Sequence, residues 1–163
     1  MDLTTDTARR DLALLSRTDR TSEQRRSELQ RLANVLTSPG LQVSVNLQDA
    51  TAFARPASTE ELHDFEINIP VKQFRQVETD LPDHQWARRV QMALLFHELG
   101  HIFYSDFERF QQRSQEVKPI YRELFRTIYN AAEDIVIEAQ LAAEYALEDD
   151  FATLNDTFKK LQR

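Results

Sequence analysis

Hydrophobic and polar positions alternate with different periods along the chain, and each change of period marks an expected element. From about residue 5 to 37, apolar side chains recur at helical spacing, and Pro39-Gly40 ends this stretch. Between residues 41 and 46 the period is two, which predicts a half-buried strand. The pattern therefore indicates an N-terminal helical part followed by extended structure.

Two more extended segments are expected before the next helix. The first lies around residues 51–55, and the second, at 65–69, alternates apolar and polar side chains. Pro70 has no backbone N–H to donate, so the second strand should end there or lie along a sheet edge. We expect these segments to form a small antiparallel sheet. If the edge of the 65–69 strand is open, an extended peptide could pair with it.

A long helix is predicted from Trp86 to Tyr104, with Pro82 before it and Asp83 as its N-cap. Its apolar stripe continues through two histidines and comprises Trp86, Val90, Ala93, Leu94, His97, His101 and Tyr104. Polar side chains placed on a buried stripe need partners, and a metal ion would satisfy them.

A last helical stretch is predicted from Pro119 to Tyr145, with a further short helix from 150 to 161. The fold class is therefore α+β. We expect a single domain over residues 1–163, with a helical part at 1–40 and the sheet and later helices at 41–163.

Composition limits the chemistry that is available. The chain has 163 residues, 41% of them hydrophobic, and a net charge of −7, which disfavours nucleic acid and membrane surfaces as partners. It has no cysteine, so a metal must be held by histidine and carboxylate. The N-terminus is charged and no apolar run approaches ~20 residues, which predicts a cytoplasmic protein.

The most informative motif is H-E-x-x-H, formed by His97, Glu98 and His101. Four residues make little more than one helical turn, so the two imidazoles share a face and can reach one Zn²⁺. Glu98 would then lie beside the open metal position as a general base that deprotonates water. Gly100 costs about 1 kcal/mol relative to alanine within a helix, which a close approach by a neighbouring backbone would explain.

Catalytic zinc usually has a third protein ligand, and the acids near residue 134 are the candidates. The main apolar face of that helix carries Leu124, Ile128, Ala131, Ala132, Ile135, Ala139 and Ala142. Asn130, Asp134 and Glu138 form a polar seam beside it, and Glu133 lies on the opposite flank. Spacing favours Asp134 as the ligand, the longer reach of Glu133 makes it the alternative, and Glu138 is a third candidate.

Neighbouring polar residues are expected to orient the ligands. Asn130 and Glu138 are candidates for this supporting role, because such partners commonly fix the imidazole rings. Tyr104 lies one turn beyond His101, where it could donate a hydrogen bond to a developing oxyanion. Packing of Tyr104 as an aromatic side chain is the competing interpretation.

The segment HELGHIFYSDF followed by IYNAAEDIVIEAQL resembles zincin-like metallopeptidase domains of phages and bacteria. Such domains often precede a von Willebrand factor A-like module, and related segments occur in cobalt-chelatase-type proteins. The resemblance covers about residues 64 to 145 and implies a zincin-like fold and a virus-related origin. The family's later helix reads N-x-x-E-D-x-x-I-E or N-x-x-x-D-x-x-I-N. Asp134 is the acid common to both versions, so the resemblance also favours it as the ligand.

A weaker resemblance is to phage-type metallopeptidases that cleave repressors, which carry HELGH and a later E-A-x-x-F-A-A segment. The run from Glu138 to Ala143 is similar to that segment, although the Leu-Leu-Met-Pro continuation is missing. This resemblance would make Glu138 the metal ligand.

The sequence therefore predicts a zinc-dependent metallopeptidase that hydrolyses a protein or peptide substrate through water activated by Glu98. One alternative is a non-catalytic structural or assembly protein, for instance of phage origin, in which zinc joins two helices. A second alternative is a protein-interaction module. The oligomeric state does not follow from the sequence.

Overall fold

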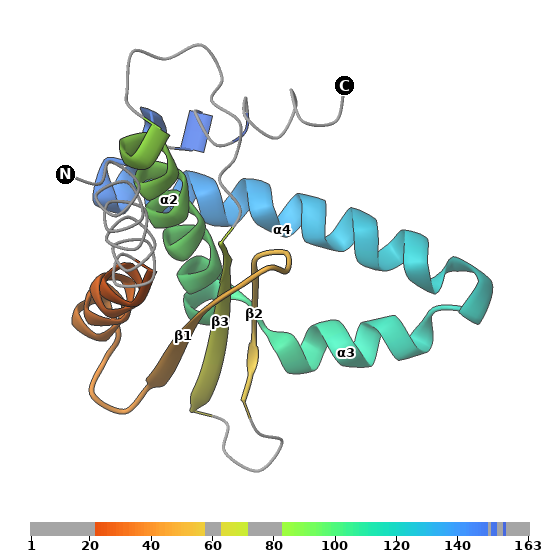
Figure 1. The fold of residues 1–163 in the computed structure, drawn as a ribbon. Coiled ribbons are helices and arrows are strands. Elements are labelled where there is room, and N and C mark those ends of the chain that lie inside the picture. Colours follow the sequence, from red (N-terminus) through yellow and green to blue (C-terminus); the bar gives the residue numbers. More distant parts are fainter. Residues whose placement is uncertain (1–21, 58–62, 72–82, 150, 153–154, 156–163) are drawn as a thin grey trace, which may run out of the picture.

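The computed structural model describes residues 22–57, 63–71, 83–149, 151, 152 and 155, with the backbone alone at 83–85. The fold is α+β (Figure 1). Its elements are a helix at 22–36, strands β1 (Gln42–Gln48), β2 (Phe53–Pro56) and β3 (Asp64–Pro70), helices α2 (Asp83–Tyr104) and α3 (Phe107–Glu116), the 3₁₀ turn η1 (Pro119–Tyr121) and helix α4 (Arg122–Tyr145).

The sheet is mixed, so the prediction of a purely antiparallel sheet is wrong. Its strand order is β1-β3-β2, with β1 parallel to β3 and β2 antiparallel to β3. Strands β2 and β3 are consecutive and form a hairpin-like pair, but β1 skips β2 and joins the far side of β3. Alternation along each segment identified the strands, whereas it carries no information on which strand pairs with which.

Strand β3 is the central strand, which corrects the expectation for the 65–69 segment. The strand ends at Pro70, as the missing N–H predicts, but both of its edges are paired. It therefore has no open edge for an extended peptide. Among the described strands, β2 lies at the sheet edge nearest the α2–α3 junction (Figure 1).

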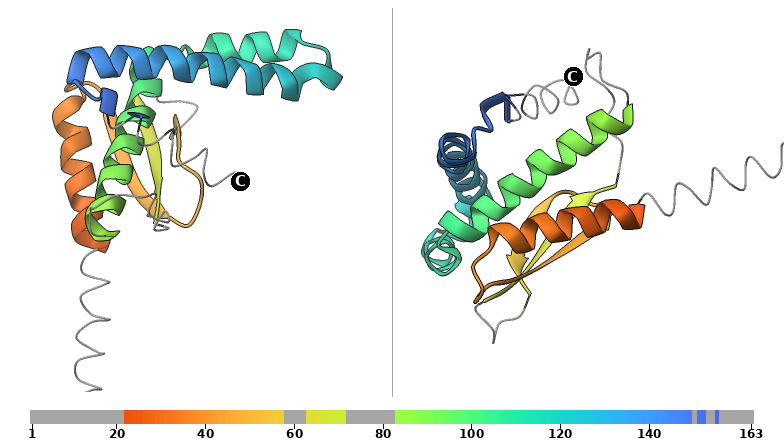
Figure 2. Two further views of the ribbon diagram at one scale, coloured as in Figure 1. Left: turned by 90° about the horizontal axis from the view of Figure 1, so that it is seen from above. Right: turned by 90° about the vertical axis from the view of Figure 1, so that its left-hand side faces the viewer.

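The core lies between one face of the sheet and the helices. Val43 pairs with Phe65, and Val45 pairs with Ile67, so these four side chains share a face, and all are buried. The helix at 22–36 adds Leu29 and Ala33 to the same core and lies beside α2 (Figure 2). Two polar contacts join these helices, one between Arg25 and Gln91 at 3.2 Å and one between Arg88 and Glu28 at 3.4 Å.

Helix α2 is buried on nearly all sides rather than along one stripe. The first four residues of the predicted stripe are buried, its two histidines are half-buried, and Tyr104 at its end is exposed. Outside the stripe, Leu95 and Leu99 are fully buried, and the polar Gln91 is buried as well. Gln91 donates to the carbonyl of Pro70 at 3.0 Å, which satisfies its amide. A helix that is apolar on all sides belongs in the centre of a fold, and α2 contacts β2, β3 and α4. The two histidines are thus presented by the best-packed helix.

Helices α2 and α4 approach each other closely at Gly100. A Cβ atom built there would overlap Ile137 Cγ2 and lie 2.7 Å from Leu141 Cδ1. Ile137 and Leu141 are the buried residues of α4. A close neighbour is therefore present at this glycine, but it consists of α4 side chains and not of the neighbouring backbone that the sequence led us to expect.

Helices α3 and α4 form an antiparallel hairpin that projects beyond the sheet (Figures 1 and 2). Phe110, Phe125 and Tyr129 pack together between them, with ring centroids 4.8 to 6.4 Å apart. Arg122 donates to the carbonyl of Ser114, and Arg126 donates to its hydroxyl, each at 3.0 Å. The aromatic contacts and the arginine hydrogen bonds together hold α3 against α4.

Most predicted helix bounds agree with the structure. The predicted helix from Pro119 to Tyr145 is η1 followed by α4, and the N-terminal one is seen at 22–36. Helix α3 was not predicted, because its ten residues are mostly polar. Asp106 could have indicated the beginning of this helix, since its side chain caps α3 by accepting the backbone N–H of Arg109. The structure does not describe residues 5–21, Pro82, the Asp83 side chain and most of 150–161.

No helix in the described ranges has the length and apolarity that a membrane span requires.

Replacing Gly100 with alanine tests the α2–α4 contact. Alanine favours a helix by about 1 kcal/mol over glycine, but overpacking against Ile137 and Leu141 costs roughly 1–3 kcal/mol. We therefore expect Gly100→Ala to lower the midpoint of thermal unfolding. Gly40→Ala is the matched control, because no atom lies within 4 Å of the added Cβ, and it should unfold like the parent. A Gly100→Ala protein more stable than the parent would contradict this packing.

Candidate metal site

His97 and His101 lie one turn apart near the C-terminal end of α2. Their ring centroids are 5.0 Å apart, and their side chains are only 15% and 17% exposed. The Nε2 atoms point toward each other at 3.3 Å. The helical spacing thus produces the convergence of two imidazoles that the sequence predicted.

Asp134 of α4 completes a group of three potential ligands. Its Oδ1 lies 3.6 Å from His97 Nε2 and 3.2 Å from His101 Nε2. One donor atom from each residue falls within 4.8 Å of the other two. Asp134 reaches this position because α4 crosses α2 at Gly100, with Ile137 one turn further along α4.

The separations between these donors suit a tetrahedral ion. Zinc binds histidine nitrogen and carboxylate oxygen at about 2.0–2.1 Å, so tetrahedral ligands are about 3.3 Å apart. The three observed separations are 3.3, 3.6 and 3.2 Å. A site with three protein donors leaves one tetrahedral position for water or substrate. The residues present therefore fit a catalytic type of zinc site.

The outer nitrogens of both rings face carboxylates. His97 Nδ1 is buried and lies 3.3 Å from Glu138 Oε1, at an angle that falls short of a hydrogen bond. His101 Nδ1 lies 3.4 Å from Glu133 Oε2 and 3.2 Å from Ser105 Oγ. Carboxylates in these positions favour the tautomer with hydrogen on Nδ1, which leaves both Nε2 lone pairs for a cation.

Charge around His97 favours a cation at this place. Burial of the ring opposes protonation, but the carboxylates of Asp134, Glu138 and Glu98 outweigh it and raise the pKa of His97 to about 10. Burial likewise disfavours ionised Asp134, yet the two histidines lower the pKa of its carboxyl well below the usual value. Two nitrogens and an ionised oxygen in contact therefore attract either a proton or a metal.

Glu98 is the buried acid of the group, with only 5% of its surface exposed. Burial raises the pKa of its carboxyl, against the opposing effect of the two histidines and a hydrogen bond with the backbone of Ala54. Ala54 belongs to β2, so Glu98 lies between the histidines and the sheet edge. A higher pKa makes a carboxylate a stronger base, which suits a group that accepts a proton from water and later returns it.

A cavity of about 440 Å³ opens beside this group. It is lined by β2 on one side, by His97, Glu98 and His101 on another, and by Asn130, Glu133 and Asp134 of α4. Phe107 and Phe110 of α3 form an apolar part of the wall. The cavity therefore brings a sheet edge, the candidate base and the metal donors to one place.

The other residues expected at the site have different positions. Asn130 lines the cavity, and Glu133, which was expected on the wetter flank, is only 20% exposed, whereas Asp134 is 40% exposed. Tyr104 donates a hydrogen bond of 2.6 Å to Glu144 and is not among the described residues that line the cavity. This placement gives no support for an oxyanion-stabilising role of Tyr104.

Several residues that the structure brings to the site were assigned no role there from the sequence, although Ser105 and Phe107 belong to the HELGHIFYSDF segment. Ser105 directly follows α2, and its contact with His101 depends on how that helix ends. Phe107 and Phe110 reach the cavity through α3, which the pattern of residues did not predict. The role of Ala54 comes from its backbone, about which the identity of its side chain says nothing.

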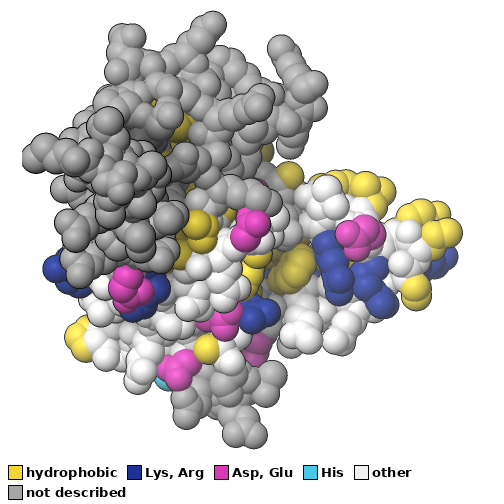
Figure 3. Space-filling view, in the orientation of Figure 1, with side chains coloured by type: hydrophobic (Ala, Val, Ile, Leu, Met, Phe, Trp, Pro, Cys, Tyr) yellow, Lys and Arg dark blue, Asp and Glu magenta, His cyan; other side chains and the backbone are white. Residues whose placement is uncertain are grey.

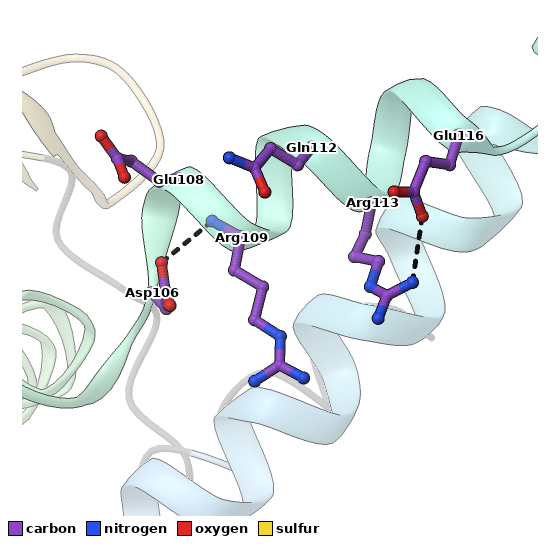
Figure 4. Close-up of a pocket in the computed structure, with 6 residues that line it drawn as sticks. All are labelled: Asp106, Glu108, Arg109, Gln112, Arg113 and Glu116. Atoms are coloured by element: carbon purple, nitrogen blue, oxygen red, sulfur yellow. Dashed lines mark hydrogen bonds and ion pairs between the residues drawn. The ribbon is translucent and has the colours of Figure 1, made fainter.

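A second concavity, of about 360 Å³, lies along α3 (Figure 4). Its side chains follow one another along a single helix: Asp106, Glu108, Arg109, Gln112, Arg113 and Glu116. Asp106 accepts the backbone N–H of Arg109, and Arg113 pairs with Glu116 at 3.0 Å. These exposed charges pair within the helix, which is typical of a solvated surface.

Searches of protein-family models, curated proteins and solved structures found no match to this chain.

Measurements of zinc affinity can distinguish a residue that binds the metal from one that only orients a ligand. Asp134→Ala should abolish stoichiometric zinc binding measured by competition with a chromogenic chelator, because it removes one of three donors. Glu133→Ala removes one of the two contacts of His101 Nδ1, leaves the contact with Ser105, and should weaken binding roughly 10–100-fold. Glu116→Ala, on the surface of α3, is the control and should bind like the parent. The reverse order of effects at Asp134 and Glu133 would make Glu133 the ligand.

Proposed function

We propose that the chain is a zinc-dependent metallopeptidase with a zincin-like site, in which His97, His101 and Asp134 hold the metal. The observation that carries the proposal is the set of donor separations, 3.2 to 3.6 Å, which matches a tetrahedral ion. Two imidazoles and one carboxylate are also a ligand set typical of catalytic zinc.

The bound metal would supply Lewis-acid chemistry, polarising a carbonyl and making water more acidic. The chain's own residues provide the rest. Glu98 accepts a proton from the attacking water and later passes it to the leaving amine, and its raised pKa suits both steps. Glu138 and Glu133 orient the two imidazoles through their Nδ1 atoms.

The position of β2 supports a peptide as the substrate. Among the described strands it pairs only with β3, and residues 52–56 line the cavity beside Glu98. An extended peptide beside this edge could form backbone hydrogen bonds with it while its scissile carbonyl lies near Glu98. The aromatic rings of Phe53, Phe107 and Phe110 would favour an apolar side chain next to that bond.

Glu98→Gln tests the catalytic proposal. The variant keeps the size of the side chain but cannot accept the proton, so kcat/KM on a mixed library of quenched fluorescent peptides should fall about 10²–10⁴-fold. Zinc binding should remain stoichiometric, because Glu98 is not a donor in the group of three. Glu116→Gln is the matched control and should cleave like the parent.

Full activity in zinc-loaded Glu98→Gln would remove Glu98 from the mechanism. A parent protein that binds zinc but cleaves no peptide would favour the structural alternative. That alternative has its own support, because the three donors join α2 to α4, and a metal there would fasten the two helices together.

A further inference from the structure

We propose that two copies of this chain associate through the outward face of α4, with the two α4 helices antiparallel. The proposal concerns the exposed apolar side of α4 that runs beside the metal donors, and it does not depend on the proposed catalytic function.

The outward face of α4 is apolar and exposed along most of the helix. Its larger side chains are 56–71% exposed: Leu124, Ile128, Ile135 and Val136. Four small side chains continue the same face and are also exposed: Ala131, Ala132, Ala139 and Ala143. We call these eight residues the α4 stripe. No charged residue interrupts it, whereas isolated apolar residues are the usual finding on a monomer surface.

The described residues leave this face uncovered. Ile137 and Leu141, on the buried side of α4, pack against α2, and Phe125 and Tyr129 pack against α3. Figure 2 shows α4 along the upper margin of the molecule in the left view and nearly end-on, again at the margin, in the right view. Figure 3 shows further hydrophobic side chains on the surface of the projecting hairpin, together with lysine and arginine side chains.

The α4 stripe has the symmetry that an antiparallel pair of identical helices requires. Six of its eight positions are arranged symmetrically about the Ala131-Ala132 bond, with Ile128 matching Ile135 and Leu124 matching Ala139. A two-fold axis through that point would place each residue opposite its match on the partner. The small alanines at the centre would let the two backbones come close.

Charge along the hairpin favours the antiparallel direction. Residues 107–126 carry five basic and three acidic side chains, whereas residues 139–149, which follow the acids that face α2, carry three acidic side chains and no basic one. Antiparallel pairing places Lys118 and Arg122 of one copy near the partner's Glu144. A parallel pair would instead bring like-charged halves together, and the helix dipoles would oppose it as well. The charge pattern therefore points to a second copy as the occupant.

The size of the α4 stripe predicts a reversible dimer. Helix α4 has 24 residues, so it is about 36 Å long and about 10 Å wide, and the face offers on the order of 400 Å² per copy. A stable interface typically uses about 800 Å² per partner. We therefore expect dissociation at low protein concentration.

Sedimentation equilibrium of the full chain tests the association. The average mass should rise with concentration from 19.1 kDa toward twice that value. Ile128→Glu and Ile135→Glu should each keep the mass at that of the monomer, because a charge would be buried in the pair. Both side chains are at least 60% exposed, so neither substitution disturbs the core. Val35→Glu, at an 80% exposed valine of the 22–36 helix, is the matched control and should associate like the parent.

Cysteine cross-linking tests the direction, and the chain has no cysteine of its own. Ala131→Cys lies next to the axis and should form a disulfide with its own copy under mild oxidation. Two copies of Leu124→Cys would be about 22 Å apart along the pair, too far for a disulfide, but Leu124→Cys should cross-link to Ala139→Cys in a mixture.

A chain that stays monomeric through the submillimolar range would overturn the proposal. So would association that Ile128→Glu and Ile135→Glu leave unchanged. Efficient self-cross-linking of Leu124→Cys would overturn the antiparallel arrangement.

Discussion

The close approach of α2 and α4 at Gly100 is the constraint on which the candidate site depends. The two imidazoles come from one helix, and their spacing follows from helical geometry alone. The carboxylate comes from a helix more than thirty residues later, and it joins them only because Ile137 and Leu141 pack where Gly100 has no side chain. Packing of apolar side chains thus positions Asp134, and the charges then hold it against the histidines.

The part of the site that was predictable from sequence is the part that one helix builds. H-E-x-x-H specifies the arrangement of His97 and His101 without any tertiary information. Asp134 was favoured by its position in a polar seam, and the structure places it with the histidines. The contacts of Glu133 and Ser105 with His101 Nδ1 could not be predicted, because they depend on the crossing angle of two helices and on the end of α2.

The fold shows the same division between local and non-local information. Alternating side chains located each strand, since that pattern reflects burial of one face. The parallel pairing of β1 with β3 could not be read from it, because pairing is decided by the path of the chain between strands. On α4 the apolar pattern identified a helix, but the apolar face faces solvent, while the acids face α2. Hydrophobicity alone does not say which face packs within the same molecule.

The length of α4 has a mechanical consequence. The helix is uninterrupted and is gripped by α2 between Ile137 and Leu141, so it behaves as a lever with its fulcrum near that grip. The hairpin end at Arg122 is about 25 Å from the fulcrum, and Asp134 is about 8 Å from it. A tilt that moves the far end by 1 Å therefore shifts Asp134 by only about 0.3 Å. Because Asp134 lies close to the contact with α2, a tilt of the projecting hairpin displaces its carboxylate much less than it displaces the far end of the helix.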